Sequence, residues 1–381
     1  MGFNDFSRFN NFTFTPSVPT NGPRDIDLRP NPKIPRRIPV VIMKTFQFFT
    51  NEDVVTNVSQ RITAGLWTGG TGSLSTFFTS SVQSGSTGDY YYDVYNGDPS
   101  SSLNEVQFAV AYGHVSGGGA PDLSTDQNST LSTQGIYSQY RNILLDPNDS
   151  KFTMAGGYNT DDIYVINVQR ARQKQKIDKG NWELTLSGSG GSIIKLIDDS
   201  VDIVDTAAGQ GGRVYNVVSG TLDVANQTSS IHTAAENEPS GGFGLFYPDV
   251  GIIVFNPTAL SHSIGIIPTV TSIALENNHG LFLGSIQSGS SFEARNEETV
   301  TSRFYFCRIK NRDFNFSNNP SFYTGSDGQF RHPSFVGDPK TYITTIGLYN
   351  EQNELLAVSK LSQPLLKTFD REALVKIKLD F

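Results

Sequence analysis

The side chains that could perform chemistry in this chain are few and widely separated. The five histidines are too far apart to form a paired metal-binding motif: His114, His232, His262, His279 and His332. Each is expected to be an ordinary surface or hydrogen-bonding histidine. The chain also lacks the G-x-S-x-G, phosphate-loop and H-E-x-x-H motifs of common enzyme classes. We therefore expect no catalytic residue, no bound metal and no cofactor.

Two acidic pairs and one cysteine are the remaining candidates for chemistry. Asp161 with Asp162, and Asp198 with Asp199, could bind a cation, but adjacent carboxylates on a strand point to opposite sides. A role in capping turns is favoured. Cys307 lies in the apolar run 304–307 and is expected to be a small buried hydrophobe, not a nucleophile. A single cysteine precludes an intrachain disulfide and fits folding in a reducing cytoplasm.

Composition points to strands and turns. The chain has 381 residues, which suggests two or three domains at roughly 150 residues each. Charged residues make up 17%, and Gly (36), Phe (26) and Tyr (15) are abundant. The net charge of −8 makes nucleic-acid binding an unfavoured function. No signal-peptide pattern and no apolar run of about 18 residues is present, so we expect no membrane association.

The segment 162–187 has the most distinctive pattern in the chain. A β-branched apolar run at 163–168 is followed by cations at every second position: Arg170, Arg172, Lys174 and Lys176. In an extended conformation these four cations would share one face. Because the net charge is negative, binding to an acidic face of another subunit is favoured over DNA contact. Beyond them, Trp182, Leu184 and Leu186 alternate with polar residues, as in a strand with one buried face.

The first 39 residues do not resemble a domain. Phenylalanines are spread among polar residues at Phe3, Phe6, Phe9 and Phe12, and seven prolines follow between 16 and 39. Proline fixes φ and removes hydrogen-bond donors, so extended chain is expected. A disordered leader is one interpretation. The other is an arm that orders on a neighbouring subunit, and a second cationic cluster would assist it: Arg29, Lys33, Arg36 and Arg37.

The rest of the sequence predicts a mainly β fold. One helix is expected at 131–145, where Ile136, Tyr140, Ile143 and Leu144 follow helical spacing. Turn residues separate short apolar runs that are expected to be strands: 40–49, 89–94, 105–114, 193–197, 213–218, 243–247, 250–255, 264–270, 280–286, 341–349, 354–359 and 373–381. We predict antiparallel β-sandwich or barrel-like domains with one or two short helices and an extended N-terminal arm.

Three parts are expected along the chain. Residues 1–39 would form the arm. Residues 40–155 would form a β-rich domain that residues 311–381 complete. Residues 156–310 would be an inserted β-sandwich-like domain.

Several long runs resemble virion structural proteins of contractile-tailed cyanophages. They are 136–147 (IYSQYRNILLDP), 163–188 (IYVINVQRARQKQKIDKGNWELTLSG), 213–221 (RVYNVVSGT), 244–260 (GLFYPDVGIIVFNPTAL) and 341–365 (TYITTIGLYNEQNELLAVSKLSQPL). The resemblance covers most of the chain beyond the arm and marks no catalytic residue. It implies a tail or baseplate component, with a neck or capsid-associated protein as the nearest alternative.

The hypothesis from sequence is thus a non-enzymatic protein of a bacteriophage virion, folded in the host cytoplasm. Its partners would be copies of itself and other virion proteins, contacted through the arm and the basic segment 162–187. The rival hypothesis is host-surface glycan binding on exposed rings such as Trp67, Trp182 or the tyrosines at 90–92. Glycan hydrolysis by paired carboxylates is a third hypothesis, for which the sequence offers no defensible pair.

Overall fold

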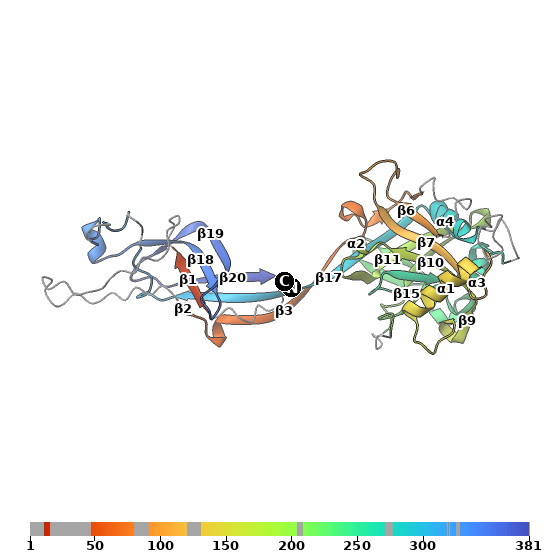
Figure 1. The fold of residues 1–381 in the computed structure, drawn as a ribbon, viewed down its shortest axis with the longest axis horizontal. Coiled ribbons are helices and arrows are strands. Elements are labelled where there is room, and N and C mark those ends of the chain that lie inside the picture. Colours follow the sequence, from red (N-terminus) through yellow and green to blue (C-terminus); the bar gives the residue numbers. More distant parts are fainter. Residues whose placement is uncertain are drawn as a thin grey trace. The chain divides into compact units, whose positions relative to one another are not determined.

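The computed structural model describes residues 11–15, 47–79, 91–119, 131–203, 209–270, 277–317, 319, 321–324 and 328–380. The expected mainly β fold is confirmed, with a large antiparallel sheet and a few helices (Figure 1). The contacts divide the chain into two units. Arg61–Thr299 form what we call the inserted unit, and Met1–Gln60 with Val300–Phe381 form the terminal unit. The chain passes between them within β3 (Val54–Gly65) and returns within β17 (Ser291–Ile309).

The inserted unit is built on one long antiparallel sheet. The path starts at β17 and continues in the order β11 (Lys176–Ser187), β12 (Ile193–Asp198), β13 (Tyr215–Asp223), β15 (Gly244–Tyr247), β16 (Ile252–Phe255), β10 (Asp162–Val168), β7 (Val106–His114), β6 (Tyr91–Tyr95) and β5 (Phe78–Thr79). Short β4 (Ser73–Leu74) pairs with β17, and β14 (Thr228–Ile231) pairs with β13. The hairpin β8 (Phe152–Met154) to β9 (Tyr158–Thr160) stands apart from this sheet.

Ring contacts show that this sheet is strongly curved. Phe108 on β7 and Phe292 on β17 lie far apart in the strand order, yet their ring centroids are 5.6 Å apart. Buried Trp67 lies against both rings, at 5.9 Å and 4.8 Å, and its indole nitrogen donates to the carbonyl of Phe292. The two ends of the path therefore close on one aromatic core.

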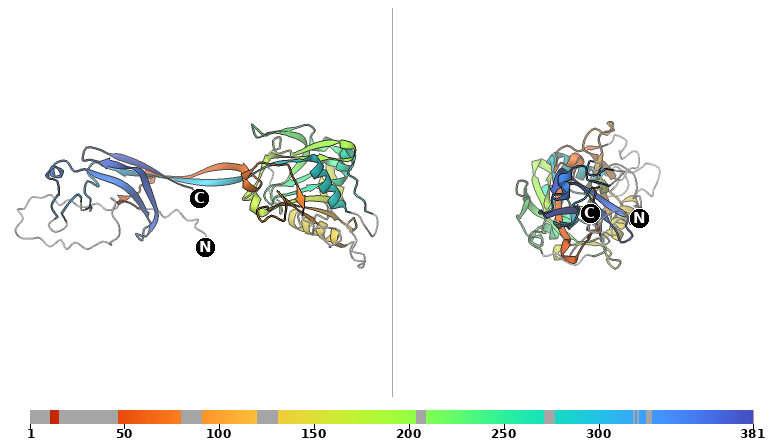
Figure 2. Two further views of the ribbon diagram at one scale, coloured as in Figure 1. Left: turned by 90° about the horizontal axis from the view of Figure 1, so that it is seen from above. Right: turned by 90° about the vertical axis from the view of Figure 1, so that its left-hand side faces the viewer.

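Helices cover both faces of the sheet. On the inner face, Phe282 of α4 (Asn278–Gly289) stacks on Tyr164 at 4.6 Å, and α3 (Pro257–Ile264) joins the same core. On the outer face, α1 (Leu131–Leu144) places Tyr137, Tyr140 and Leu144 in a second core; it is yellow in Figure 1 and Figure 2. Because both faces are covered, strands such as β10 are buried almost throughout.

The helix expected at 131–145 is confirmed, but its buried face is rotated. Tyr137 is buried, whereas Ile143 is 42% exposed. Two expected strands are wrong. Residues 280–286 lie in α4, whose Phe282, Leu283 and Ile286 have helical spacing and whose start is capped by the Asn277 side chain accepting from Gly280 N. The other predicted strand, 264–270, begins at the last residue of α3, and residues 265–270 form no regular element.

The terminal unit is a small sandwich of two sheets. One sheet has the order β19 (Leu355–Lys367), β18 (Thr341–Tyr349), β1 (Asn11–Thr15) and β2 (Gln47–Phe48). The other consists of β20 (Ala373–Asp380), the end of β17 and β3. Ile343, Ile346 and Leu348 from the first sheet share one core with Tyr305, Cys307 and Ile377 from the second. Figure 2 shows β18 and β19 (blue) side by side.

An insertion within a unit built from both ends of the chain is therefore present, but its boundaries are not those drawn from the sequence. Residues 61–155 belong with 156–299, not with the C-terminal strands. From the expected arm, residues 11–15 form β1 inside the terminal unit. The other residues of the arm lie outside the described part of the chain.

Candidate assembly surfaces

The first surface is the outer edge of β19, which within the described part of the chain pairs with β18 alone and ends its sheet. A strand at a sheet edge presents a row of unpaired backbone N–H and C=O groups to whatever approaches it. Here the row starts among aliphatic side chains: Leu355, Leu356 and Val358 are 52%, 46% and 53% exposed. Such an edge is a template for pairing with another chain.

The two halves of β19 differ in how well they could accept another strand. The second half carries Lys360 and Pro364, residue types by which natural proteins blunt an edge. The first half, 355–359, contains neither a charge nor a proline. Ala357 to Ser359 pair regularly with Leu348 to Ile346, a register shift lies between Ala357 and Leu355, and Ala357 joins the core. The free edge, as we call residues 355–359, is therefore the part suited to docking.

The second surface considered from sequence, the cationic segment, does not have the expected shape. Arg170–Gln173 form the one-turn helix α2, and Lys174 has a φ of 56°, so the four cations do not lie on one extended face. The buried side chain of Gln173 holds this turn by donating to the carbonyls of Pro248 and Asp249. A tertiary contact has thus overridden the alternation of the sequence.

Three of these cations are also paired within the chain. Arg172 binds Glu105 at 2.9 Å and donates to the Thr68 hydroxyl, Lys174 binds Glu298 at 3.1 Å, and Lys176 binds Glu297 at 3.0 Å. Arg170 is exposed and forms no ion pair among the described residues. It lines a pocket of about 240 Å³ with Asp93 and Asn167. Little of the cationic charge is therefore left for an acidic partner.

Beside Lys176 lies a buried pair of acids that the sequence did not reveal. Arg61 bridges Asp178 and Glu297, and the remaining oxygens accept from Asn181 (2.8 Å) and Lys176 (3.0 Å). Burial raises the pKa of Asp178, while Lys176 and Arg61 outweigh burial and lower the pKa of Glu297. Each of the four carboxylate oxygens has a partner, so the pair has the contacts of a structural ion-pair network.

The turn-capping role predicted for the acidic pairs does not describe them: their carboxylates contact a neighbouring strand or a distant side chain. Both oxygens of Asp198 accept from the backbone N–H of Gly180, at 2.9 and 3.0 Å, where β11 has a register shift. Burial raises the pKa of Asp198 to about 6. Asp199 accepts from the backbone and side chain of Asn216. Asp161 binds Lys151, and Asp162 accepts from the Tyr112 hydroxyl.

The aromatic rings proposed for glycan binding are mostly in the core. Trp67 and Trp182 are each 1% exposed, so neither presents a face to a sugar. Tyr92 is half-buried with its ring on buried His279 at 4.8 Å, and Tyr91 is 46% exposed. Among the described residues no group of three or more His, Cys, Asp or Glu side chains could hold a metal ion.

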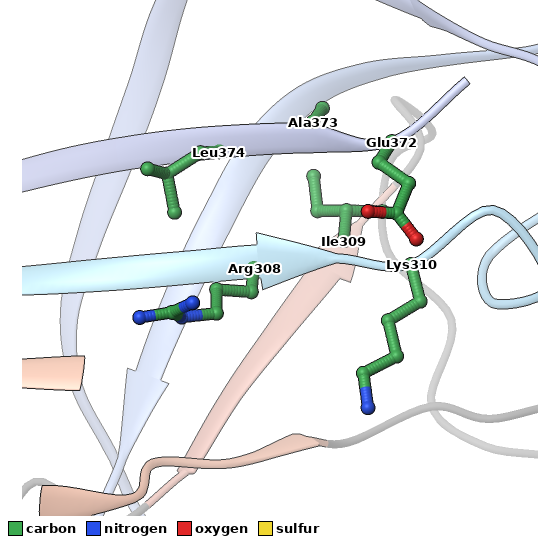
Figure 3. Close-up of a pocket in the computed structure, with 6 residues that line it drawn as sticks. All are labelled: Arg308, Ile309, Lys310, Glu372, Ala373 and Leu374. Atoms are coloured by element: carbon green, nitrogen blue, oxygen red, sulfur yellow. The ribbon is translucent and has the colours of Figure 1, made fainter. Parts of the chain in front are cut away.

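A shallow groove in the terminal unit follows the ends of β17 and β20 (Figure 3). Its volume is about 350 Å³, and Arg308, Lys310, Glu372 and Leu374 are among its lining residues. Arg308 is bound to Asp53 at 2.6 Å, and Figure 3 shows Lys310 extending away from Glu372. The groove gathers no set of converging polar groups that would fix a small ligand.

Other interface residues expected from the sequence cannot be placed. Phe3, Phe6, Phe9, Arg29, Lys33, Arg36 and Arg37 lie outside the described residues, and Phe12 is placed only by the backbone of β1. The free edge was missed, although 354–359 was correctly expected to be a strand. The local signal that could have indicated an edge is the run of aliphatic residues in this strand, which the structure shows to be exposed.

Comparison with known proteins identifies no family: no family model, no curated protein and no solved structure matches the chain. Within the described residues, no helix is long and apolar enough to cross a membrane.

Proposed function

We propose that this protein is a non-enzymatic structural component of a bacteriophage virion, built into a ring or tube of the tail or baseplate. The long runs that resemble virion proteins of contractile-tailed cyanophages support the class of function. One structural observation supports the mode of action. It is the free edge of β19, where backbone groups that meet no second strand among the described residues lie beside three exposed aliphatic residues.

The free edge gives this proposal a physical basis. A partner strand would satisfy the backbone groups along 355–359 and would cover Leu355, Leu356 and Val358. Removing apolar surface from water contributes about 25 cal/mol per Å², and backbone hydrogen bonds add directionality. A repeated contact of this kind builds a ring when its rotation closes. A neck or capsid-associated position is the second candidate, since the same contact would serve in any symmetric part of a particle.

The proposed contact through the free edge is tested by introducing charged side chains into residues 355–359. The double variant Leu356→Lys/Val358→Lys should stay folded, because both side chains are about half exposed, but should assemble at least tenfold more weakly than wild type. The matched control Ser362→Lys/Gln363→Lys changes the blunted half of the same strand and should assemble normally. Sedimentation velocity and negative-stain images would compare the three proteins. If all three proteins assemble equally well, the free edge does not mediate assembly.

The virion assignment is tested separately. Mass spectrometry of purified particles should detect the chain in a fixed ratio to the other particle proteins, and immunogold labelling should place it at the tail end. Absence of the chain from particles purified to constant composition would overturn the assignment. Labelling at the head–tail junction would favour the neck.

A further inference from the structure

We propose that the N-terminal strand β1 is exchanged between copies, so that residues 11–15 of one subunit complete the sandwich of its neighbour. This inference rests on the proposed function only in requiring that copies assemble. It identifies the second copy as the partner and the position between β18 and β2 as the acceptor site, which we call the β1 slot. The slot is distinct from the free edge of β19, which lies on the other side of β18.

The first support is that β1 is a strand inserted between elements from elsewhere in the chain. It pairs antiparallel with β18 along all five of its residues, from Asn11 opposite Tyr349 to Thr15 opposite Thr345. On its other side, as far as the described residues extend, it pairs with β2 at Asn11 and Phe12. Without β1, the edge of β18 in this stretch would lack a partner, and β2 would lose its place in the sheet. The sandwich is therefore incomplete without a strand from the N-terminal segment.

The register makes the slot specific for this sequence. Phe12 and Phe14 stand opposite Leu348 and Ile346, which are both buried members of the sandwich core. Directly opposite residues of an antiparallel pair share a sheet face, so a shift by one residue would exchange the phenylalanine and polar positions. The alternation of residues 11–15 (NFTFT) thus fits the slot in one register. A neighbour's copy of the same five residues fits it equally well.

The second support is the length of chain between β1 and β2. Two adjacent antiparallel strands need a connection of only two to five residues, as in a hairpin. Here residues 16–46 separate them, roughly 30 residues, which could reach up to about 100 Å at ~3.3 Å per residue. A connection of this length is far longer than pairing within one chain requires. It is long enough for β1 to reach the β1 slot of an adjacent copy.

Exchange would also serve an assembly better than pairing within each chain. The contacts of β1 are identical in the two arrangements, so exchange costs little once copies are held close together. Separating two subunits would then require withdrawing a strand from a sandwich instead of parting two surfaces. The free edge would bring copies together, and the exchanged strand would lock them.

The test uses the full-length chain and paired cysteines. In Thr15→Cys/Thr345→Cys the two cysteines occupy positions that are paired in the backbone register of β1 and β18. In the matched control Thr345→Cys/Lys360→Cys the pair spans β18 and β19, which the five residues 350–354 join within one chain. The native Cys307 is buried and its pKa is raised to about 12, so it should not interfere. Each protein is assembled, oxidised and analysed on non-reducing denaturing gels.

Exchange predicts that most of the assembled Thr15→Cys/Thr345→Cys protein runs as covalent dimers and higher multimers, while the control runs as monomer. A mixture of the single variants Thr15→Cys and Thr345→Cys, co-assembled, should give a disulfide-linked heterodimer. Assembled particles in which the first pair forms only intrachain bonds would overturn exchange but leave the proposed function standing. Monomeric protein at every concentration, with intrachain bonds only, would overturn both.

Discussion

Lys176 Nζ lies 3.0 Å from Glu297 Oε1, so an ion pair joins the neighbouring strands β11 and β17 of the inserted unit. Glu297 is only 8% exposed and also binds Arg61, whereas its neighbour Glu298 is 40% exposed and pairs with Lys174. Two adjacent glutamates thus have the same kind of partner but different burial. Burial decides what each pair contributes to stability.

The first prediction follows from this contrast. Glu297→Gln should lower the free energy of unfolding by about 1–3 kcal/mol, because the buried side chain loses its charge-assisted bonds to Lys176 and Arg61. Glu298→Gln should lower it by less than about 1 kcal/mol, since an exposed pair is well screened. Urea unfolding of the two variants would measure the difference. Equal losses would show that the network around Arg61 is not stabilising the fold.

The raised pKa of Asp198 predicts that the stability of the folded protein depends on pH. Its pKa is raised to about 6 in the folded protein by burial, above the value of about 4 in an unfolded chain. Between pH 4 and 6 the folded state therefore binds a proton on Asp198 that the unfolded state does not. The contribution of this proton to the free energy of unfolding is fully present below pH 4 and is lost as the pH rises through 6. Thermal unfolding from pH 4 to 8 should show wild type losing stability relative to Asp198→Asn across this window. Parallel curves for the two proteins would contradict the assignment.

Trp67 should be a critical core residue of the inserted unit and not a ligand-binding ring. Trp67→Ala removes its contacts with Phe108 and Phe292 and should cost about 3–5 kcal/mol. Trp67→Phe keeps most of the ring but loses the hydrogen bond to the carbonyl of Phe292, and should cost about 1–3 kcal/mol. Denaturant unfolding would give both values. A stable Trp67→Ala protein with altered glycan binding would revive the glycan hypothesis.

Substituting the two arginines of α2 one at a time tests whether the cationic segment stabilises the fold or contacts a partner. Arg172 is held by Glu105 and Thr68, so Arg172→Ala should cost about 1 kcal/mol. Arg170 is exposed, so Arg170→Ala should stay within about 0.5 kcal/mol of wild type. Unfolding curves test this order. A strong loss of assembly from Arg170→Ala alone would show that this cation does contact a partner.

Cys307 should be unreactive in the folded protein. It is fully buried in the sandwich core, and burial raises its pKa to about 12, so thiolate is scarce at neutral pH. A maleimide reagent should label it at least a hundredfold more slowly in buffer than in denaturant. Rapid labelling of the folded chain would mean that the terminal unit opens readily, and would also complicate the cysteine test of strand exchange.

The sequence by itself determined the class of fold and many of its elements. The alternation at Trp182, Leu184 and Leu186 predicted a strand, and β11 has all three buried. Helical spacing predicted α1, and the apolar run at 304–307 predicted a buried Cys307. These features depend on local periodicity, which records whether a side chain faces a core.

Only the tertiary structure decided which surfaces are left for partners. The cations from Arg172 to Lys176 look free in the sequence, but distant Glu105 and Glu297 neutralise charges among them. Residues 280–286 were mistaken for a strand because a short apolar run does not distinguish a buried helix from a buried strand. Whether β19 ends a sheet, and where β1 inserts, depends on pairing between residues hundreds of positions apart. Local propensity carries no information about such pairings, since they are selected by the packing of the whole core.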